Sequence, residues 1–255
     1  MSKHNRKLSP RLWQPTYLLN RAISGSLRKL VNVIKRSGTE GQVLDVGCGS
    51  MPYKDLFHPI AHFYVGCDMY PANSDVVACP ADELAFADGQ FDVVVCFQVL
   101  EHVPRPGVVL RECARVLKTG GVAVVTVPFL FPYHGAPRDY FRYTPDGMAA
   151  LAESAGMKIA MTDPQVPLIA TMFMLLNIQI LEVTGVAQRI PGIRLLIGFL
   201  NGLFFSASNS LGLACGFFDS TQRGKNFPGY ANYAFVLRKL EPGPEDLGSA
   251  DGKPE

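Results

Sequence analysis

The stretch Val43-Leu44-Asp45-Val46-Gly47-Cys48-Gly49-Ser50 decides the fold of this 255-residue chain. Its short apolar run is typical of a buried parallel strand. The two glycines that follow let the backbone turn sharply and approach a ligand closely. Ligands of open α/β sheets bind at the carboxyl ends of the strands. We therefore expect Asp45 and the glycine loop to lie at the site of a nucleotide-like cofactor.

Two common nucleotide-binding loops do not fit this stretch. The dinucleotide fingerprint G-x-G-x-x-G/A needs a third small residue, and the chain has Pro52 there. A phosphate-binding P-loop needs Gly-Lys-Ser/Thr, which is also missing from the stretch. What remains is D-x-G-x-G directly after a strand.

The residues downstream predict alternating strands and helices. A second strand, residues 64–68, ends at Asp68, which lies ~20 residues beyond the glycines, where an acid meets a ribose in nucleotide-binding sheets. Further strands are expected near residues 91–96, 122–128, 158–162 and 232–239, and an amphipathic helix over residues 105–118 ends at Gly120-Gly121. The segment Leu100-Glu101-His102 follows the strand that contains Phe91-Asp92.

These motifs together resemble the type 11, ubiquinone-biosynthesis-like branch of the class I S-adenosylmethionine-dependent methyltransferases. The resemblance covers roughly residues 41–160 and the last strand. It implies an α/β fold, a Rossmann-like seven-stranded sheet with helices on both faces, and S-adenosylmethionine as the cofactor, whose amino-acid part the glycine loop passes. The cofactor contacts that it implies are Asp45, Gly47, Cys48, Gly49, Asp68, Met69, Asp82 and Gln98.

One position departs from the family pattern. The family usually places an Asp four residues before the Leu that Leu84 matches, where it binds the adenine amino group, and this chain has Pro80 there. Asp82 and the backbone of Ala81 are the alternatives for that contact.

Two histidines are candidates for catalysis, because an oxygen nucleophile benefits from a general base with a pKa near neutrality. We expect His134 to serve the acceptor, with His102 as the alternative. His134 belongs to a polar loop, residues 129–144, that resembles the P-x-H-x-x-P-x-D-Y-x-R-Y-T segment of type 11 relatives, several of which act on sugars or lipid-linked intermediates. The substrate contacts expected from this loop are Asp139, Tyr140, Arg142 and Tyr143. In the alternative, Asp139 and Arg142 pair to hold the loop, and Tyr143 belongs to the core.

Composition narrows the function classes. A net charge of +2 without interleaved basic and aromatic residues argues against nucleic acid as a partner. The six cysteines are isolated, and neither they nor the five histidines show metal-ligand spacing, so we expect no metal and read the cysteines as buried thiols in a reducing, cytoplasmic compartment.

Three segments flank or interrupt the catalytic domain, residues 41–240. Residues 1–40 hold an amphipathic helix over 17–34 whose basic face either is solvated or meets anionic lipid at the inner face of the membrane. Residues 166–218 form an apolar helical insert, broken at Pro191-Gly192, in which neither half is a clean membrane span. We expect a lid over the site, with membrane contact or a dimer interface as alternatives. The tail, residues 241–255, is expected to be disordered.

Two functions remain open. The first is an enzyme that O-methylates a small-molecule, sugar or lipid-linked acceptor. The second is a catalytically silent methyltransferase-fold scaffold that acts through its apolar insert. Asp45, Gly47, Gly49 and Asp68 favour the enzyme, and Pro80 favours the scaffold.

Overall fold

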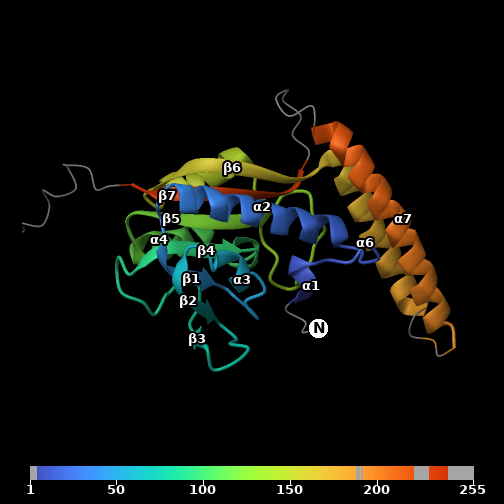
Figure 1. Ribbon diagram of the computed structural model, residues 1–255. Helices are drawn as coiled ribbons and strands as arrows, with labels where there is room; N and C mark the ends of the chain where they lie inside the picture. Colours follow the sequence, from blue (N-terminus) through green and yellow to red (C-terminus); the bar gives the residue numbers. More distant parts are fainter. Residues whose placement is uncertain (1–4, 188–189, 191, 221–229, 241–255) are drawn as a thin grey trace, which may run out of the picture.

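The computed structural model describes residues 5–187, 190, 192–220 and 230–240, so the tail expected to be disordered lies outside the described residues. The described chain forms one seven-stranded sheet in the order β3-β2-β1-β4-β5-β7-β6, in which β7 is antiparallel to both of its neighbours (Figure 1). This arrangement confirms the expected α/β fold. The strands are β1 (Gly41–Val46), β2 (Ala61–Asp68), β3 (Val76–Ala78), β4 (Phe91–Phe97), β5 (Leu117–Pro128), β6 (Met157–Pro167) and β7 (Tyr230–Lys239).

Helices connect these strands and cover both faces of the sheet. They are α1 (Asn5–Leu8), α2 (Tyr17–Arg36), α3 (Lys54–Phe57), the 3-10 turn η1 (Leu100–His102), α4 (Pro106–Val116), α5 (Pro145–Glu153), α6 (Leu168–Ala187) and α7 (Arg194–Ser220). The helix expected over residues 105–118 ends earlier, at Val116, because β5 already begins at Leu117. The resemblance implies seven strands, but the position of the short edge strand β3 was not predicted, since three residues are too few to show a periodic pattern.

Alternating side chains of the central strands pack into two separate hydrophobic cores, one on each face of the sheet. Val94 and Cys96 of β4 pack with Val109 of α4 and Met148 of α5 on one face of the sheet. Val93 and Val95, which point the other way, pack with α2 and α3, including Leu27 and Phe57. A parallel strand that is buried on both faces reads as a continuous apolar run, and this explains the valine-rich sequence of β4 and β5.

The apolar insert folds into two antiparallel helices, α6 and α7, that leave the sheet at the carboxyl end of β6 (Figure 1). Both helices contain a window long and apolar enough to cross a membrane, Leu168–Gly185 and Arg194–Phe217, although such windows also occur in soluble proteins. By length and composition alone, both halves thus meet a criterion for a span that was not expected of them from the sequence. The pair packs on the body through α2: a Cβ on Gly212 would stand 2.7 Å from Cδ1 of Leu18.

Candidate active site

The glycine loop after β1 has a backbone that other residues would not allow. Gly47 and Gly49 have φ angles of 65° and 52°, in the left-handed region that glycine adopts without steric cost. A Cβ on Gly47 would lie 2.5 Å from Cγ2 of Val99. The turn therefore brings its own backbone against η1, and it leaves open space beside the ends of β1 and β2.

A first hollow, of about 320 Å³, lies at the end of β1; we call it the Asp45 hollow. Its wall includes Lys7 from α1, the glycine loop with Cys48, and Gln98. Asp45 is 2% exposed and accepts a hydrogen bond from the Tyr64 hydroxyl at 2.7 Å. Burial raises the pKa of Asp45 to about 7, against the lowering effect of that hydrogen bond. This carboxyl is therefore poised to ionise when a cationic group binds beside it.

A second hollow, of about 560 Å³, adjoins the first, because Gly47 and Gln98 line both; we call it the Asp68 hollow. Asp68 ends β2, and its carboxylate accepts the N–H groups of Gly49 (2.9 Å) and Tyr70 (2.8 Å). This carboxylate thus ties β2 to the glycine loop while it lines the hollow. Met69 and Asp82 line the same hollow.

Asp82 is engaged by a neighbouring cation. Its Oδ2 lies 2.8 Å from Nη2 of Arg105, and its side chain is 29% exposed. The backbone segment that carries Ala81 also lines the Asp68 hollow. Both alternatives for the adenine contact therefore lie at the site where the sequence placed them.

Gln98 is held rigidly at the boundary of the two hollows. It has a φ of 56°, which is uncommon for a residue other than glycine. Its Nε2 donates to Oγ1 of Thr126 (3.2 Å) and to Oδ1 of Asn232 (3.1 Å). Asn232 in turn donates to Oε1 of Gln165 at the end of β6. This buried amide chain reaches from the cofactor region to the base of the helical insert.

The two candidate histidines are neighbours of similar exposure, with side chains that are 30% (His102) and 33% (His134) exposed. Their ring centroids lie 4.9 Å apart in an edge-to-face arrangement. His102 lines the Asp68 hollow, and its Nδ1 contacts the carbonyl oxygen of Arg138. A carbonyl accepts from Nδ1–H, so Nε2 remains as the basic nitrogen. Nδ1 of His134 lies 3.2 Å from the carbonyl oxygen of Pro132, and burial lowers the pKa of His134. The structure thus places His102, the alternative, in the hollow, and the expectation for His134 stays a prediction.

The polar loop is held by a clamp, and this corrects two of the expected substrate contacts. Arg142 binds both carboxylate oxygens of Asp139, at 2.6 and 2.7 Å, and donates to the carbonyl oxygens of Phe131 and Pro132. The Asp139 side chain is 0% exposed. The guanidinium holds the pKa of Asp139 well below its usual range. These two residues hold the loop, as the alternative reading expected.

The two tyrosines of the loop that were expected to contact the substrate differ in their surroundings. Tyr143 is 6% exposed and donates its hydroxyl to the carbonyl oxygen of Leu100 at 2.8 Å, so it belongs to the core rather than to a substrate contact. Tyr140 is 48% exposed and lines the Asp68 hollow, where the sequence placed it. Arg138 also lines this hollow, and its Nη1 lies 3.8 Å from Sδ of Met69. The sequence reading missed Arg138, because no spacing rule separates it from the other loop cations.

A buried acid beside the histidines was also missed. Glu101 is 0% exposed, and its two carboxylate oxygens have no hydrogen-bond partner among the described residues. Burial raises its pKa to about 7. Its Oε1 lies 3.8 Å from Nε2 of His102, and the potential ligand atoms of Glu101, His102 and His134 all lie within 4.8 Å of one another. Spacing along the chain could not group these three, because the loop brings His134 back from a distant segment.

Comparisons with known proteins agree with this geometry. The family described as "Methyltransferase domain" matches residues 44–125. The ubiquinone biosynthesis O-methyltransferase of Bordetella avium is 31% identical over 149 residues, which are 46% of this chain and 62% of that protein. The enzyme of the same name from Pseudomonas paraeruginosa is 30% identical over 158 residues, 49% of this chain and 68% of that protein.

Solved structures share the fold at low sequence identity. The 1,6-didemethyltoxoflavin-N1-methyltransferase of Burkholderia thailandensis, solved with S-adenosylhomocysteine, has a TM-score of 0.52 at 16% identity and covers 89% of this chain and 84% of its own. The [4+2]-cyclase SpnF has a TM-score of 0.54 at 20% identity, with 86% and 82% covered. Since one of these is named a cyclase, the fold alone does not determine the reaction.

The fold and the site define the class I methyltransferase architecture. The chain belongs to the S-adenosylmethionine-dependent methyltransferases, in their type 11 branch. Its cofactor is accordingly S-adenosylmethionine, and the site residues fit it: two adjoining hollows, a cradle that a Cβ on Gly47 would disturb, and an acid in each hollow. The chain matches 62% of the length of the Bordetella avium relative, so its reaction and acceptor are matters for proposal.

Proposed function

We propose that this protein transfers a methyl group from S-adenosylmethionine to a hydroxyl oxygen of a small-molecule, sugar or lipid-linked acceptor. The observation that carries the proposal is the placement of His102 in the Asp68 hollow, which adjoins the Asp45 hollow at Gly47 and Gln98. The curated relatives, which are named O-methyltransferases, support an oxygen acceptor.

The residues divide between holding the cofactor and preparing the acceptor. Asp45 would bind the ammonium group of the cofactor, Asp68 its ribose hydroxyls, and Asp82 or the backbone of Ala81 its adenine amino group. Gly47, Cys48, Gly49, Met69 and Gln98 would shape the space around it. When bound, S-adenosylmethionine supplies an electrophilic methyl group on a sulfonium sulfur.

His102 acts on the acceptor as a general base. Nε2 of His102 would take the hydroxyl proton of the acceptor as its oxygen attacks the methyl group that the cofactor would supply. The imidazolium that results is stabilised by the carbonyl oxygen of Arg138 and by Glu101, 3.8 Å away, once that acid is ionised. Arg138 and Tyr140 line the hollow on the acceptor side. Alignment of donor and acceptor supplies much of the acceleration.

A labelled-methyl experiment tests the proposal. The protein is incubated with methyl-labelled S-adenosylmethionine and fractionated cell extract, and products are identified by mass spectrometry. We expect label in a methyl ether. Label on nitrogen or carbon would refute the oxygen acceptor. Cofactor binding in calorimetry without any methyl transfer would instead support the catalytically silent scaffold. The sequence feature that favours this alternative is Pro80, which stands where the family usually has the acid that binds adenine.

A further inference from the structure

The α6–α7 hairpin exposes apolar side chains along its whole length. Val183 is 69% exposed, Leu195 86%, Phe199 64% and Phe217 68%. More than half of the exposed large apolar side chains in the described chain belong to these two helices. Soluble proteins rarely leave contiguous apolar surface of this extent uncovered, so the hairpin is a surface for an apolar partner.

Several polar side chains of the hairpin turn inward or bond to their own helix, whereas Gln179, Glu182 and Arg194 are exposed. Nδ2 of Asn177 donates to Oδ1 of Asn209 at 3.0 Å, and both residues are 0% exposed. Nδ2 of Asn201 donates to Oγ1 of Thr184 at 2.8 Å, and the Ser206 hydroxyl bonds to a carbonyl oxygen one turn back. Polar contacts at the interface between α6 and α7, together with apolar side chains on their outer surface, are typical of helices that pack within a membrane.

The body of the protein determines how this hairpin can meet a bilayer. Nδ2 of Asn209 donates to the carbonyl oxygens of Leu12 and Gln14, at 2.7 and 2.9 Å, so one flank of α7 is bound to the N-terminal segment. The two helices, of 20 and 27 residues, are ~30 and ~40 Å long at ~1.5 Å per residue. Because part of this length is attached to the body, the hairpin fits an interfacial position better than a full span.

The helix beside the hairpin is cationic. Helix α2 contains no acidic residue, and its exposed face carries Arg21, Arg28, Lys29, Lys35 and Arg36. A bilayer with anionic headgroups attracts such a face, by ~1 kcal/mol for each cation near the surface. A second copy of this chain would bring like charges together instead. Apolar surface and a basic patch are the two signals that stable membrane attachment requires.

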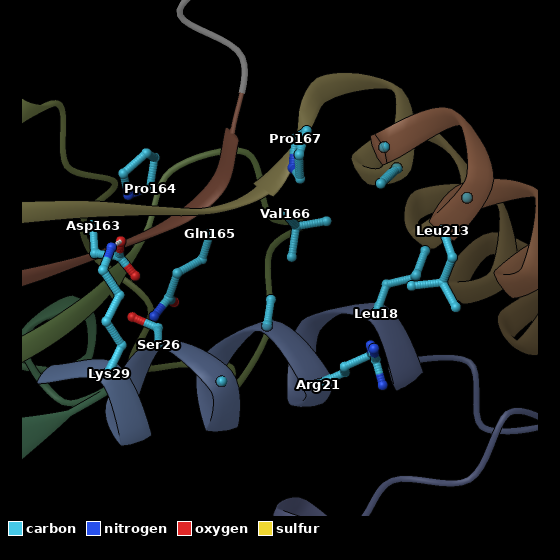
Figure 2. Close-up of a pocket in the computed structure, with 15 residues that line it drawn as sticks. Leu18, Arg21, Ser26, Lys29, Asp163, Pro164, Gln165, Val166, Pro167 and Leu213 are labelled. Atoms are coloured by element: carbon cyan, nitrogen blue, oxygen red, sulfur yellow. Dashed lines mark hydrogen bonds and ion pairs between the residues drawn. The ribbon is translucent and has the colours of Figure 1, made fainter. Parts of the chain in front are cut away.

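A cavity of about 350 Å³ lies where α2 meets the base of the hairpin (Figure 2). Its α2 side carries Arg21 and Lys29, and Lys29 pairs with Asp163. Figure 2 shows the side chains of Ser26 and Gln165, which both line the cavity, pointing toward each other. Oγ of Ser26 and Nε2 of Gln165 are buried without a hydrogen-bond partner among the described residues. On the hairpin side the wall is apolar. Cations and orphaned polar atoms on one side and hydrocarbon on the other match a phospholipid headgroup and the start of its acyl chain.

We propose that α2 and the α6–α7 hairpin form a docking surface for an anionic phospholipid bilayer, and that the cavity at their junction holds one lipid headgroup. The surface lies outside the two hollows of the active site, so this proposal stands independently of the proposed methyl transfer. It replaces the expected lid, because among the described residues neither hollow takes a lining residue from the hairpin.

Vesicle flotation of the full chain tests the docking surface. We expect the protein to float with phosphatidylcholine vesicles that contain phosphatidylglycerol, and less with phosphatidylcholine alone. Phe199→Glu with Leu203→Glu should weaken flotation at least about tenfold, since two exposed apolar side chains become charged. The matched control is Phe63→Glu, which changes a side chain of β2 that is 70% exposed, away from the hairpin, and should float like the wild type. Circular dichroism and cofactor calorimetry confirm that each variant is folded.

Three outcomes would overturn the proposal. The first is recovery of the wild type in the soluble fraction at both low and high salt. The second is equal flotation of the hairpin variant and the control. The third is a wild-type dimer in light scattering that the hairpin variant converts to a monomer without any vesicle binding, which would assign the surface to a second copy.

A separate measurement addresses the cavity. Ser26→Leu places a larger apolar side chain beside Gln165 and should weaken binding of short-chain phosphatidylglycerol, measured by native mass spectrometry, by about tenfold. Glycerol phosphate without acyl chains should bind neither protein measurably, which separates a lipid from a free phosphate. Equal lipid binding by the variant and the wild type would refute the claim that the cavity binds a lipid headgroup.

Discussion

The imidazole rings of His102 and His134 lie edge to face with their centroids 4.9 Å apart, but of the two His102 is the one that lines the Asp68 hollow. Nδ1 of His134 contacts the carbonyl oxygen of Pro132 and lies 3.3 Å from the carboxylate of Asp139. From this arrangement we expect His102 to act as the base and His134 to hold the His102 ring in position.

His102→Ala should lower turnover by ~10²–10⁴-fold while the dissociation constant of S-adenosylmethionine stays nearly unchanged, because a general base acts on the acceptor and not on the cofactor. His134→Ala should have a smaller effect, since it removes packing and not the base. Steady-state kinetics and calorimetry measure the two quantities. His58→Ala is the control, because this histidine is exposed on the segment after α3. Loss of turnover in His134→Ala with an active His102→Ala would reverse the roles.

Cofactor binding should tighten by about tenfold as the pH rises from 6 to 8, about fivefold of it between pH 6 and 7, and then level off. Burial raises the pKa of Asp45 to about 7, so below that pH the empty site holds a neutral carboxyl. A cationic ammonium group requires the carboxylate, and binding at pH 6 must therefore release a proton. Calorimetry in two buffers of different ionisation enthalpy measures that proton release.

Asp45→Asn is the matched variant for this pH dependence. Its amide oxygen can still accept the Tyr64 hydroxyl bond, but it cannot ionise. We expect weaker binding that does not change between pH 6 and pH 8. A wild-type dissociation constant that is flat over this range would exclude Asp45 as the titrating group.

Asp68→Ala should weaken S-adenosylmethionine binding by ~1–3 kcal/mol, because ribose hydroxyls lose their acceptor. The variant also frees the N–H groups of Gly49 and Tyr70, so the thermal midpoint is measured alongside the calorimetry. Asp55→Ala, at a side chain that is 78% exposed on α3, should change neither quantity. An unchanged dissociation constant in folded Asp68→Ala would refute the ribose contact.

Gly47→Ala should destabilise the fold by ~1–3 kcal/mol in urea denaturation and weaken cofactor binding. The new Cβ would stand 2.5 Å from Cγ2 of Val99, at a φ of 65°. Adding Val99→Ala removes the clash and should recover part of the loss. Gly49→Ala separates the two causes, because its φ is 52° but nothing lies within 4 Å of the added Cβ. If Gly47→Ala and Gly49→Ala lose equal stability, the clash with Val99 contributes nothing.

The cofactor side of the site could be predicted from the sequence, and the acceptor side could not. Asp45, Gly47 and Asp68 lie at the carboxyl ends of β1 and β2 or directly after them, so the alternation of strands and helices already places them at one sheet edge. The roles of His102 and His134 depend on how the loop of residues 129–144 folds back onto η1, and no local pattern encodes that path. Likewise, Gln98 and Asn232 lie 134 residues apart and meet only because β7 inserts beside β5.

Arg142→Ala should cost about 3 kcal/mol of folding free energy in urea denaturation at pH 7, because it leaves the buried Asp139 carboxylate without its bidentate partner. Arg142→Lys should recover little, since a lysine cannot donate to two carboxylate oxygens and three carbonyl oxygens from a planar fork. Arg105→Ala breaks the more exposed pair with Asp82 and should cost less than about 1 kcal/mol.

The same clamp predicts a dependence on pH. Because the folded-state pKa of Asp139 is depressed, its contribution to stability is complete above the ordinary carboxyl pKa of about 4 and is lost as the pH falls further. The stability difference between the wild type and Asp139→Asn should therefore be constant from pH 7 to pH 5 and shrink below pH ~4. A difference that grows as the pH falls would show that the clamp does not hold Asp139 as a carboxylate. Arg142→Ala and Asp139→Asn should both also lower turnover. The loop that the Asp139–Arg142 pair holds carries Arg138 and Tyr140, which line the Asp68 hollow on the acceptor side.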